Sequence, residues 1–211
     1  MNEYDNEPIP GLPGRLPPGE NILWQGSPDW RALARTAFHT RLVAGYFAAL
    51  WVLALGLALA NGGYTGVVIT GLLGVVGVAL LHLLAWASAK TTIYTLTNRR
   101  IVLRIGIAVP KCINLPLATI ASVDLAARAD GTGDLPLRLT GAPMLGFLAL
   151  WPHTRPWRVN RPQPMLRSVP DAATVAASIA QACLAVSPEG RVAAAHERRA
   201  PMPAMLEAQA A

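Results

Sequence analysis

Residues 42–87 read LVAGYFAALWVLALGLALANGGYTGVVITGLLGVVGVALLHLLAWA and contain no Asp, Glu, Lys or Arg. The polar turn Asn61-Gly62-Gly63-Tyr64 divides this stretch into two apolar segments, residues 42–60 and 65–87. At helical rise the segments are about 28 and 35 Å long, and each is enough to cross the hydrocarbon core of a bilayer. The sequence therefore predicts a transmembrane helical hairpin.

Basic residues flank this hairpin on both sides, whereas the turn between the two spans carries no charge. They are Arg31, Arg35, His39 and Arg41 before it, and Lys90, Arg99, Arg100 and Arg104 after it. Basic flanks are retained on the cytoplasmic side of a membrane. We therefore expect a multi-pass protein with both termini in the cytoplasm and the turn on the other side.

The composition is basic, with 18 Lys and Arg against 12 Asp and Glu, a formal net charge of +6. Much of this excess lies beside the two spans, where topology and the anionic leaflet already account for it. No basic stripe is interleaved with aromatic residues in a nucleic-acid-binding motif. The sequence therefore predicts no nucleic-acid partner.

The rest of the chain divides around the hairpin by composition. Proline excludes regular structure from the N-terminal arm, and the C-terminal tail, rich in Ala, Pro and charge, is predicted to be disordered. The predicted parts are the arm (1–18), a first strand and a juxtamembrane helix (19–41), the transmembrane hairpin (42–89), a β domain with a C-terminal helix (90–186) and the tail (187–211).

After residue 89 the long apolar runs give way to short alternating ones, separated by turns rich in Gly, Pro and Asp. This pattern predicts a membrane α+β protein whose cytoplasmic part is a small antiparallel sheet or partial barrel plugged by a helix. The expected strands are residues 20–25, 92–96, 100–105, 111–115, 120–127, 135–139 and 147–151; the expected helices are 29–40, capped by Asp29, and 171–185.

No catalytic residue and no metal site are predicted, because the carboxylates are scattered and no nucleophile–base signature is present. The segment Asp130-Gly131-Thr132-Gly133-Asp134 resembles a calcium loop. It lacks the further oxygen ligands and the closing Glu that such a loop requires. Asp and Gly also supply the dihedral angles of a tight turn, so we interpret the segment as a hairpin turn.

His82 is the one ionisable side chain of note within the predicted spans, and such a residue is a functional candidate by default. It is a candidate ligand for the magnesium of a pigment, or a hydrogen-bonding partner for another helix. The alternative is a histidine near the cytoplasmic end of its span that bonds a backbone carbonyl or reaches the lipid headgroups. The sequence favours this second interpretation.

Small residues form one face of the second span: Gly66, Thr70, Gly71 and Gly74. Such a face permits close approach of another helix. It can pack the two spans against each other, or it can bind the helix of a partner protein. The sequence leaves both roles open.

Residues 151–167 combine tryptophan, arginine and proline in one rigid segment. Its candidate partner-binding residues are Trp151, Arg155, Trp157 and Arg158, to which His153, Arg161 and Arg167 add basic character. Such a segment can dock on lipid headgroups or on an acidic protein surface, since Trp and Arg are enriched at interfaces. It can equally be a connection whose tryptophan rings cover the core.

Several unusual short sequence motifs in this chain occur in the order found in one family. They are Leu16-Pro17-Pro18-Gly19-Glu20, Trp24-Gln25-Gly26-Ser27-Pro28-Asp29-Trp30, Tyr94-Thr95-Leu96-Thr97-Asn98-Arg99-Arg100-Ile101, Arg104-Ile105-Gly106-Ile107-Ala108, Ala129-Asp130-Gly131-Thr132-Gly133-Asp134-Leu135-Pro136 and Leu150-Trp151-Pro152-His153-Thr154-Arg155-Pro156-Trp157-Arg158. From about residue 12 to residue 185 the chain resembles the PuhB family of photosynthetic complex assembly proteins, which are membrane-anchored bacterial PH-like proteins.

The resemblance implies a non-enzymatic chaperone or assembly factor of the bacterial inner, intracytoplasmic photosynthetic membrane. Its implied partners are unfinished reaction-centre subunits and core antenna polypeptides. It implies no cofactor, although light-harvesting polypeptides bind bacteriochlorophyll through a span histidine preceded four residues earlier by alanine. Here that earlier position is Val78, which weakens the pigment interpretation of His82.

The resemblance also predicts that the first strand, residues 21–25, pairs with the sheet beyond the spans, so that the hairpin is an insertion within the domain. Two other functions stay open: a general membrane-anchored PH-like protein that binds lipid or protein partners, and a bacteriochlorophyll-handling protein. The sequence also leaves a homodimer open.

Overall fold

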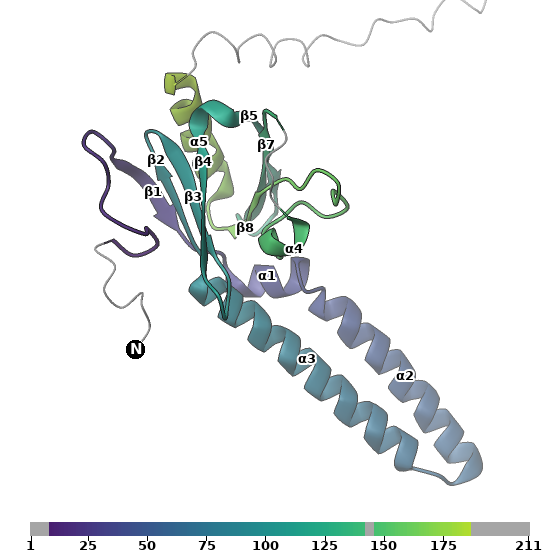
Figure 1. Cartoon of the computed structure of the whole chain (residues 1–211). Helices are drawn as coiled ribbons and strands as arrows, with labels where there is room; N and C mark the ends of the chain where they lie inside the picture. Colours follow the sequence, from purple (N-terminus) through teal and green to yellow (C-terminus); the bar gives the residue numbers. More distant parts are fainter. Residues whose placement is uncertain (1–8, 142–145, 187–211) are drawn as a thin grey trace, which may run out of the picture.

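The structure, a computed structural model, describes residues 9–141 and 146–186 (Figure 1). Two long antiparallel helices, α2 (Thr40–Asn61) and α3 (Thr65–Thr91), project together from a domain of antiparallel sheets. The short helix α1 (Trp30–Thr36) lies where the domain meets the hairpin. This arrangement confirms the predicted α+β fold class, and the predicted tail at 187–211 lies outside the described residues.

Both long helices are long and apolar enough to span a membrane, and almost none of their apolar surface is buried inside the molecule. Val75, for example, keeps 70% of its surface exposed. A continuous apolar surface of this size is costly in water and is typical of a lipid-facing or partner-facing surface. Compared with the predicted spans, α2 begins two residues earlier and α3 continues to Thr91, directly before the next strand.

The first sheet has the strand order β1-β2-β3-β4. Its strands are β1 (Ile22–Gly26), β2 (Ile93–Thr97), β3 (Arg100–Ile105) and β4 (Lys111–Pro116). Strand β1 pairs antiparallel with β2, with Trp24 opposite Leu96 and Gly26 opposite Tyr94. The pairing confirms the predicted insertion, since α1, α2 and α3 all lie between two neighbouring strands.

The second sheet is built around β7, which pairs with β5, β6 and β8. Its strands are β5 (Ile120–Val123), β6 (Ala126–Ala127), β7 (Gly133–Leu139) and β8 (Met165–Val169). The single strand predicted at 120–127 is therefore two strands, and β8 was not predicted. All five residues of β8 are buried, so the strand lacks the alternation by which strands are recognised.

The strand predicted at residues 147–151 is wrong, because Phe147–Leu150 forms the helical turn α4. A short apolar run cannot be assigned to helix or strand by periodicity alone. The C-terminal helix α5 (Ala172–Val186) is confirmed and directs Val175, Ile179 and Cys183 into the core between the two sheets. The 3-10 turn η1 (Leu117–Thr119) connects the sheets and adds Leu117 to that core.

A buried carboxylate attaches the N-terminal segment to the first sheet. Glu20 is only 5% exposed and accepts hydrogen bonds from Arg100 Nε at 2.8 Å, Arg100 Nη2 at 3.0 Å and the Thr97 hydroxyl at 2.8 Å. Burial alone would raise the pKa of Glu20, but Arg100 and Thr97 outweigh it and hold the pKa below its ordinary value. The predicted arm also packs here, with Leu12 buried and Pro10 accepting a hydrogen bond from Gln25.

Helix α1 joins the hairpin to the domain. Asp29 caps it as predicted, accepting a hydrogen bond from the Ala32 N–H at 2.7 Å, although the helix ends earlier than expected. One face of α1 packs against the C-terminal part of α3, in a cluster that includes Leu33, Phe38, Ala85 and Ala89. The other side is tied to the second sheet, because the Asp29 N–H donates to Ser168 O at 2.8 Å.

The insertion predicts how fragments of the chain behave. A fragment of residues 90–186 has an unpaired β2 edge and leaves Arg100 without Glu20, so we expect it to lack a cooperative thermal transition. Joining residues 9–28 to it through a flexible linker restores β1 and Glu20, and should restore cooperative unfolding followed by tryptophan fluorescence. Equal cooperativity in both fragments would show that β1 is not part of the folding unit.

The buried ion pair predicts a second outcome. Glu20→Gln should lower the unfolding free energy at pH 7 by about 3 kcal/mol, because it leaves the Arg100 guanidinium without its carboxylate. This corresponds to a fall in the melting temperature of roughly 10 °C for a domain of this size. Asp124→Asn is the matched control: its ion pairs with Arg155 and Arg138 are half exposed, at 3.4 and 3.8 Å, and are worth at most about 1 kcal/mol.

The same ion pair also predicts how the unfolding free energy of wild type and of Glu20→Gln depends on pH. The pKa of Glu20 is lower in the folded protein than in the unfolded chain, where it is near 4.3. The ionised Glu20 therefore contributes fully to the unfolding free energy above that pH, and this contribution is lost as the pH falls through the pKa of the folded state. Wild type should therefore lose stability below about pH 4, and Glu20→Gln should lose less. An identical acid-side decline in both proteins would contradict this assignment.

Candidate functional site

The predicted small-residue face lies partly inside the hairpin. A Cβ atom added at Gly71 would lie 3.1 Å from Trp51 Nε1, and one added at Gly74 would lie 2.9 Å from Phe47 Cβ. At these two positions the glycines make room for aromatic side chains of α2. Their small size therefore serves packing within the hairpin, and a role in binding a second protein stays a prediction.

The other two members of this face are open. An added Cβ at Gly66 would have no neighbour within 4 Å, and the Thr70 hydroxyl donates to Gly66 O at 2.7 Å. Between α2 and α3 runs an apolar groove of about 590 Å³, lined by residues that include Phe47, Trp51 and Thr70. Gly71 and Gly74 also line this groove, which therefore lies alongside their contacts with α2.

His82 lies on α3, partly buried, and its Nδ1 donates to the carbonyl oxygen of Val78 at 2.8 Å. This is the backbone hydrogen bond that the second interpretation of the sequence anticipated. It leaves Nε2 as the ring nitrogen that can contact another group. His82 lines a pocket together with Arg31 and Arg41, and its role as a magnesium ligand stays a prediction.

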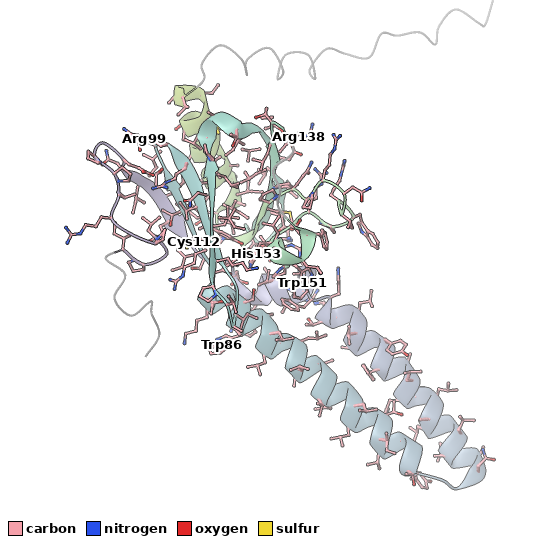
Figure 2. All side chains as sticks on the ribbon, in the orientation of Figure 1. Trp86, Arg99, Cys112, Arg138, Trp151 and His153 are labelled. Carbon is pink, nitrogen blue, oxygen red and sulfur yellow. The ribbon has the colours of Figure 1, made fainter. Side chains whose placement is uncertain are left out.

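The segment from α4 to residue 159 carries the most exposed apolar side chains of the domain. Trp157 is 95% exposed and Leu148 is 87% exposed, while Trp151 keeps half of its surface. Trp151 also contacts Phe38 edge to face, at 5.4 Å between ring centroids, which places it beside the junction of α1 and α2 (Figure 2). Trp151 therefore presents a half-exposed aromatic ring close to the base of the hairpin.

The arginines of this segment differ in their surroundings. Arg155 contacts Asp124 Oδ2 at 3.4 Å and Gln163 Oε1 at 3.3 Å, so its charge is partly compensated. Within the described residues, Arg158 has no carboxylate partner, and it is exposed next to Trp157. Trp151, Trp157 and Arg158 are thus exposed, and Arg155 is partly exposed, within one segment of the chain. That they form one binding surface, and what they bind, stay predictions.

Two basic residues assigned to this surface are instead buried. His153 has no exposed surface, and Arg167, 9% exposed, belongs to β8 and donates through Nη1 to Pro152 O at 3.1 Å. His153 Nδ1 lies 2.6 Å from the Tyr94 hydroxyl, and its Nε2 lies 3.1 Å from Thr92 Oγ1. Sequence reasoning missed this cluster because Thr92 and Tyr94 lie about sixty residues earlier.

The hydrogen bonds of this buried cluster fit a neutral imidazole. The Tyr94 oxygen accepts from the Arg167 N–H at 3.1 Å, so its own proton is free to go to His153 Nδ1, and Nε2–H then donates to Thr92. Burial and, to a lesser degree, the charge of Arg167 lower the pKa of His153 to about 3, while burial raises that of Tyr94. The cluster joins β2, the end of α3 and β8 at the base of the domain.

The Asp130–Asp134 segment forms the predicted hairpin turn between β6 and β7. Asp130 Oδ1 accepts from the Thr132 hydroxyl and N–H, at 2.6 and 3.1 Å, and these bonds lower its pKa, assisted by Arg35. Asp134 accepts from the Ser168 N–H and pairs with Arg128. In the part of the chain that the structure describes, no three His, Cys, Asp or Glu side chains gather as a metal site.

Comparisons with known proteins give three likenesses. The bacterial PH domain family matches residues 41–182, which include both long helices and the strands from β2 to β8. A protein of Rhodobacter capsulatus, described as an uncharacterized 23.7 kDa protein in the puhA 5′ region, is 40% identical over 202 residues, covering 92% of this chain and 94% of the relative.

The third likeness is to a crystal structure of a DUF1696 family protein with a pleckstrin-homology domain from Shewanella loihica PV-4. It is 18% identical, covers 44% of this chain and 71% of the other, and has a TM-score of 0.30.

The buried histidine predicts a pH-dependent stability. The unfolded state takes up a proton near pH 6.5 that the folded state refuses until about pH 3, so stability should fall by several kcal/mol as the pH falls through this window. His153→Phe should abolish that slope. At pH 7 it should also cost roughly 1–3 kcal/mol for each hydroxyl, of Tyr94 and Thr92, left without its partner.

Thermal unfolding of the detergent-solubilised protein between pH 4.5 and 7.5 measures this slope. The control is His39→Asn, which removes an exposed histidine at a position with φ +50°, a conformation that Asn tolerates. His39→Asn should keep the wild-type slope. A slope that survives in His153→Phe would assign the titration to another group.

Proposed function

The chain belongs to the bacterial PH domain family, and we propose that it is a non-enzymatic assembly factor for the photosynthetic reaction centre and its core antenna. The observation that carries the proposal is the relative of nearly equal length, encoded in the region 5′ of the photosynthesis gene puhA in Rhodobacter capsulatus. The short sequence motifs that resemble those of the PuhB family support the same role.

In this proposal α2 and α3 cross the photosynthetic inner membrane, with both termini and the PH domain in the cytoplasm. The exposed apolar surface of both helices and their basic flanks support this topology. Because the hairpin is inserted between β1 and β2, and α1 is attached to both α3 and β8, the domain is held at a fixed height above the bilayer.

The proposed binding surface is formed by α4 and the segment after it, with Leu148, Trp151 and Trp157 as apolar anchors and Arg158 as a free charge. Tryptophan is highly buried on average, whereas Trp157 is 95% exposed, and Trp and Arg are enriched among the residues that dominate interface energetics. The partner that fits has an apolar, acidic surface at the cytoplasmic side of the membrane. An unfinished reaction-centre or antenna subunit, whose own neighbours have not yet arrived, offers such a surface.

This mechanism is transient covering of surfaces, and it assigns no catalytic residue and no cofactor. The proposed binding surface covers the exposed apolar surface of the partner and holds the partner in place until the next subunit displaces it. A general membrane-anchored PH-like protein would use the same anchor without photosynthetic partners, and the experiment below separates the two.

The test is the near-infrared absorption of membranes from cells that lack this gene, complemented with full-length variants. Deletion should reduce the reaction-centre and core-antenna bands selectively, with the peripheral antenna retained. The variant Trp157→Ala/Arg158→Ala should restore these bands to no more than about half, because loss of an interface tryptophan costs about 2 kcal/mol, roughly 30-fold in affinity.

The matched control is Val109→Ala/Lys111→Ala, which also removes an exposed apolar side chain and an exposed charge, here at the β3–β4 connection. It should complement fully. Unchanged bands in the deletion strain would contradict the assembly role and favour the general PH-like protein. Full complementation by Trp157→Ala/Arg158→Ala would move the binding surface elsewhere.

A further inference from the structure

A basic pocket of about 390 Å³ lies where α1 crosses the cytoplasmic ends of α2 and α3. Its polar walls are formed by Arg31 and Arg35 of α1, Arg41 of α2 and His82 of α3, with the Trp30 ring beside them. Among the residues that the structure describes, no carboxylate lines it. The pocket therefore gathers positive charge at the depth where the headgroups of a bilayer would lie.

The charge in this pocket is only partly compensated. Arg35 Nη2 contacts Asp130 Oδ2 at 2.9 Å. Across residues 9–141 and 146–186, neither Arg31 nor Arg41 has a carboxylate partner; Arg31 instead lies over the Trp30 ring at 5.3 Å. No side chain caps the N-terminus of α2, which adds a partial positive charge at the pocket wall. An anion is thus the ligand that this pocket favours.

The pocket continues into the apolar groove between the two helices. Ala44 of α2 and Val78 of α3 line both the basic pocket and the groove of about 590 Å³. Beyond these two residues the walls are apolar, with Phe47, Trp51 and Val75 among them. The basic pocket thus opens into the apolar groove, which runs along the membrane-spanning part of the hairpin.

We propose that this composite cavity binds one anionic phospholipid, with its phosphate between Arg31 and Arg41 and an acyl chain in the groove. Arginine pairs of this kind hold phosphate through charge-assisted hydrogen bonds, and basic pockets between membrane helices on the cytoplasmic side are suited to lipid headgroups. The inference is independent of the assembly role, since it needs only the hairpin and α1.

The packing of the groove favours a lipid chain over a partner helix. A partner helix would need to approach closely on the face of Gly71 and Gly74, but Trp51 and Phe47 of α2 already occupy that face. A flexible acyl chain has no such requirement.

The experiment uses the full chain, purified in mild detergent and equilibrated with equal amounts of phosphatidylglycerol and phosphatidylcholine. Native mass spectrometry counts the lipid retained by each protein. Wild type should keep one phosphatidylglycerol, preferred at least about tenfold over phosphatidylcholine, and Arg31→Gln/Arg41→Gln should lose most of this preference. Arg15→Gln/Arg99→Gln removes the same charge from exposed positions outside both proposed binding sites, in the N-terminal segment and the β2–β3 turn, and should behave as wild type.

Two further arms separate the headgroup from the chain. Ala44→Phe narrows the passage between pocket and groove without changing the charge, and should also lower phosphatidylglycerol retention. Excess inorganic phosphate should displace little lipid, because it lacks the acyl chain. Loss of lipid at millimolar phosphate would overturn the proposal in favour of a free-phosphate site.

Other outcomes also overturn it. Equal retention of both lipids would mean that the pocket does not discriminate between the phosphatidylglycerol and phosphatidylcholine headgroups. Equal loss in both arginine variants would assign the preference to diffuse surface charge. None of these outcomes depends on the near-infrared bands, so this proposal and the assembly role can fail separately.

Discussion

Strand β1 pairs with β2 although α1, α2 and α3 lie between them in the chain, and most other features of the structure depend on that pairing. It brings the entry and the exit of the hairpin to the same edge of one sheet. Glu20 reinforces the closure, because its carboxylate is buried against Arg100 and Thr97 of the neighbouring strands. A hairpin attached at one end could swing, whereas one attached at both ends cannot.

The second attachment is polar and sits at the base of the domain. α1 packs on α3 through apolar residues, but its link to the second sheet runs through Asp29, Ser168 and the Arg35–Asp130 pair. Behind it, His153 and Tyr94 fill a space that an apolar core would otherwise occupy. Buried polar groups tolerate few arrangements, because each lost partner is costly, so this base has a defined geometry.

Much of the fold could be predicted from local patterns. The hairpin follows from hydropathy and length, the α1 cap from Asp29, and the β6–β7 turn from Asp130 and its glycines. Strand β8 could not be predicted, since it is buried on both faces and lies between Pro164 and Pro170. His153 resembles a surface residue in its Pro-rich segment, and only tertiary contacts with Thr92 and Tyr94 reveal that it is buried.

The same limit applies to function. The predicted binding segment around Trp157 is contiguous in sequence, so composition alone was enough to propose it, whereas the basic pocket draws on three helices. Arg35 connects that pocket to the domain, because it lines the cavity and also pairs with Asp130 in the β6–β7 turn. The Arg35–Asp130 pair therefore joins the wall of the pocket to the second sheet, so the pocket that we propose for a lipid headgroup is linked to the domain by side chains as well as by the chain itself.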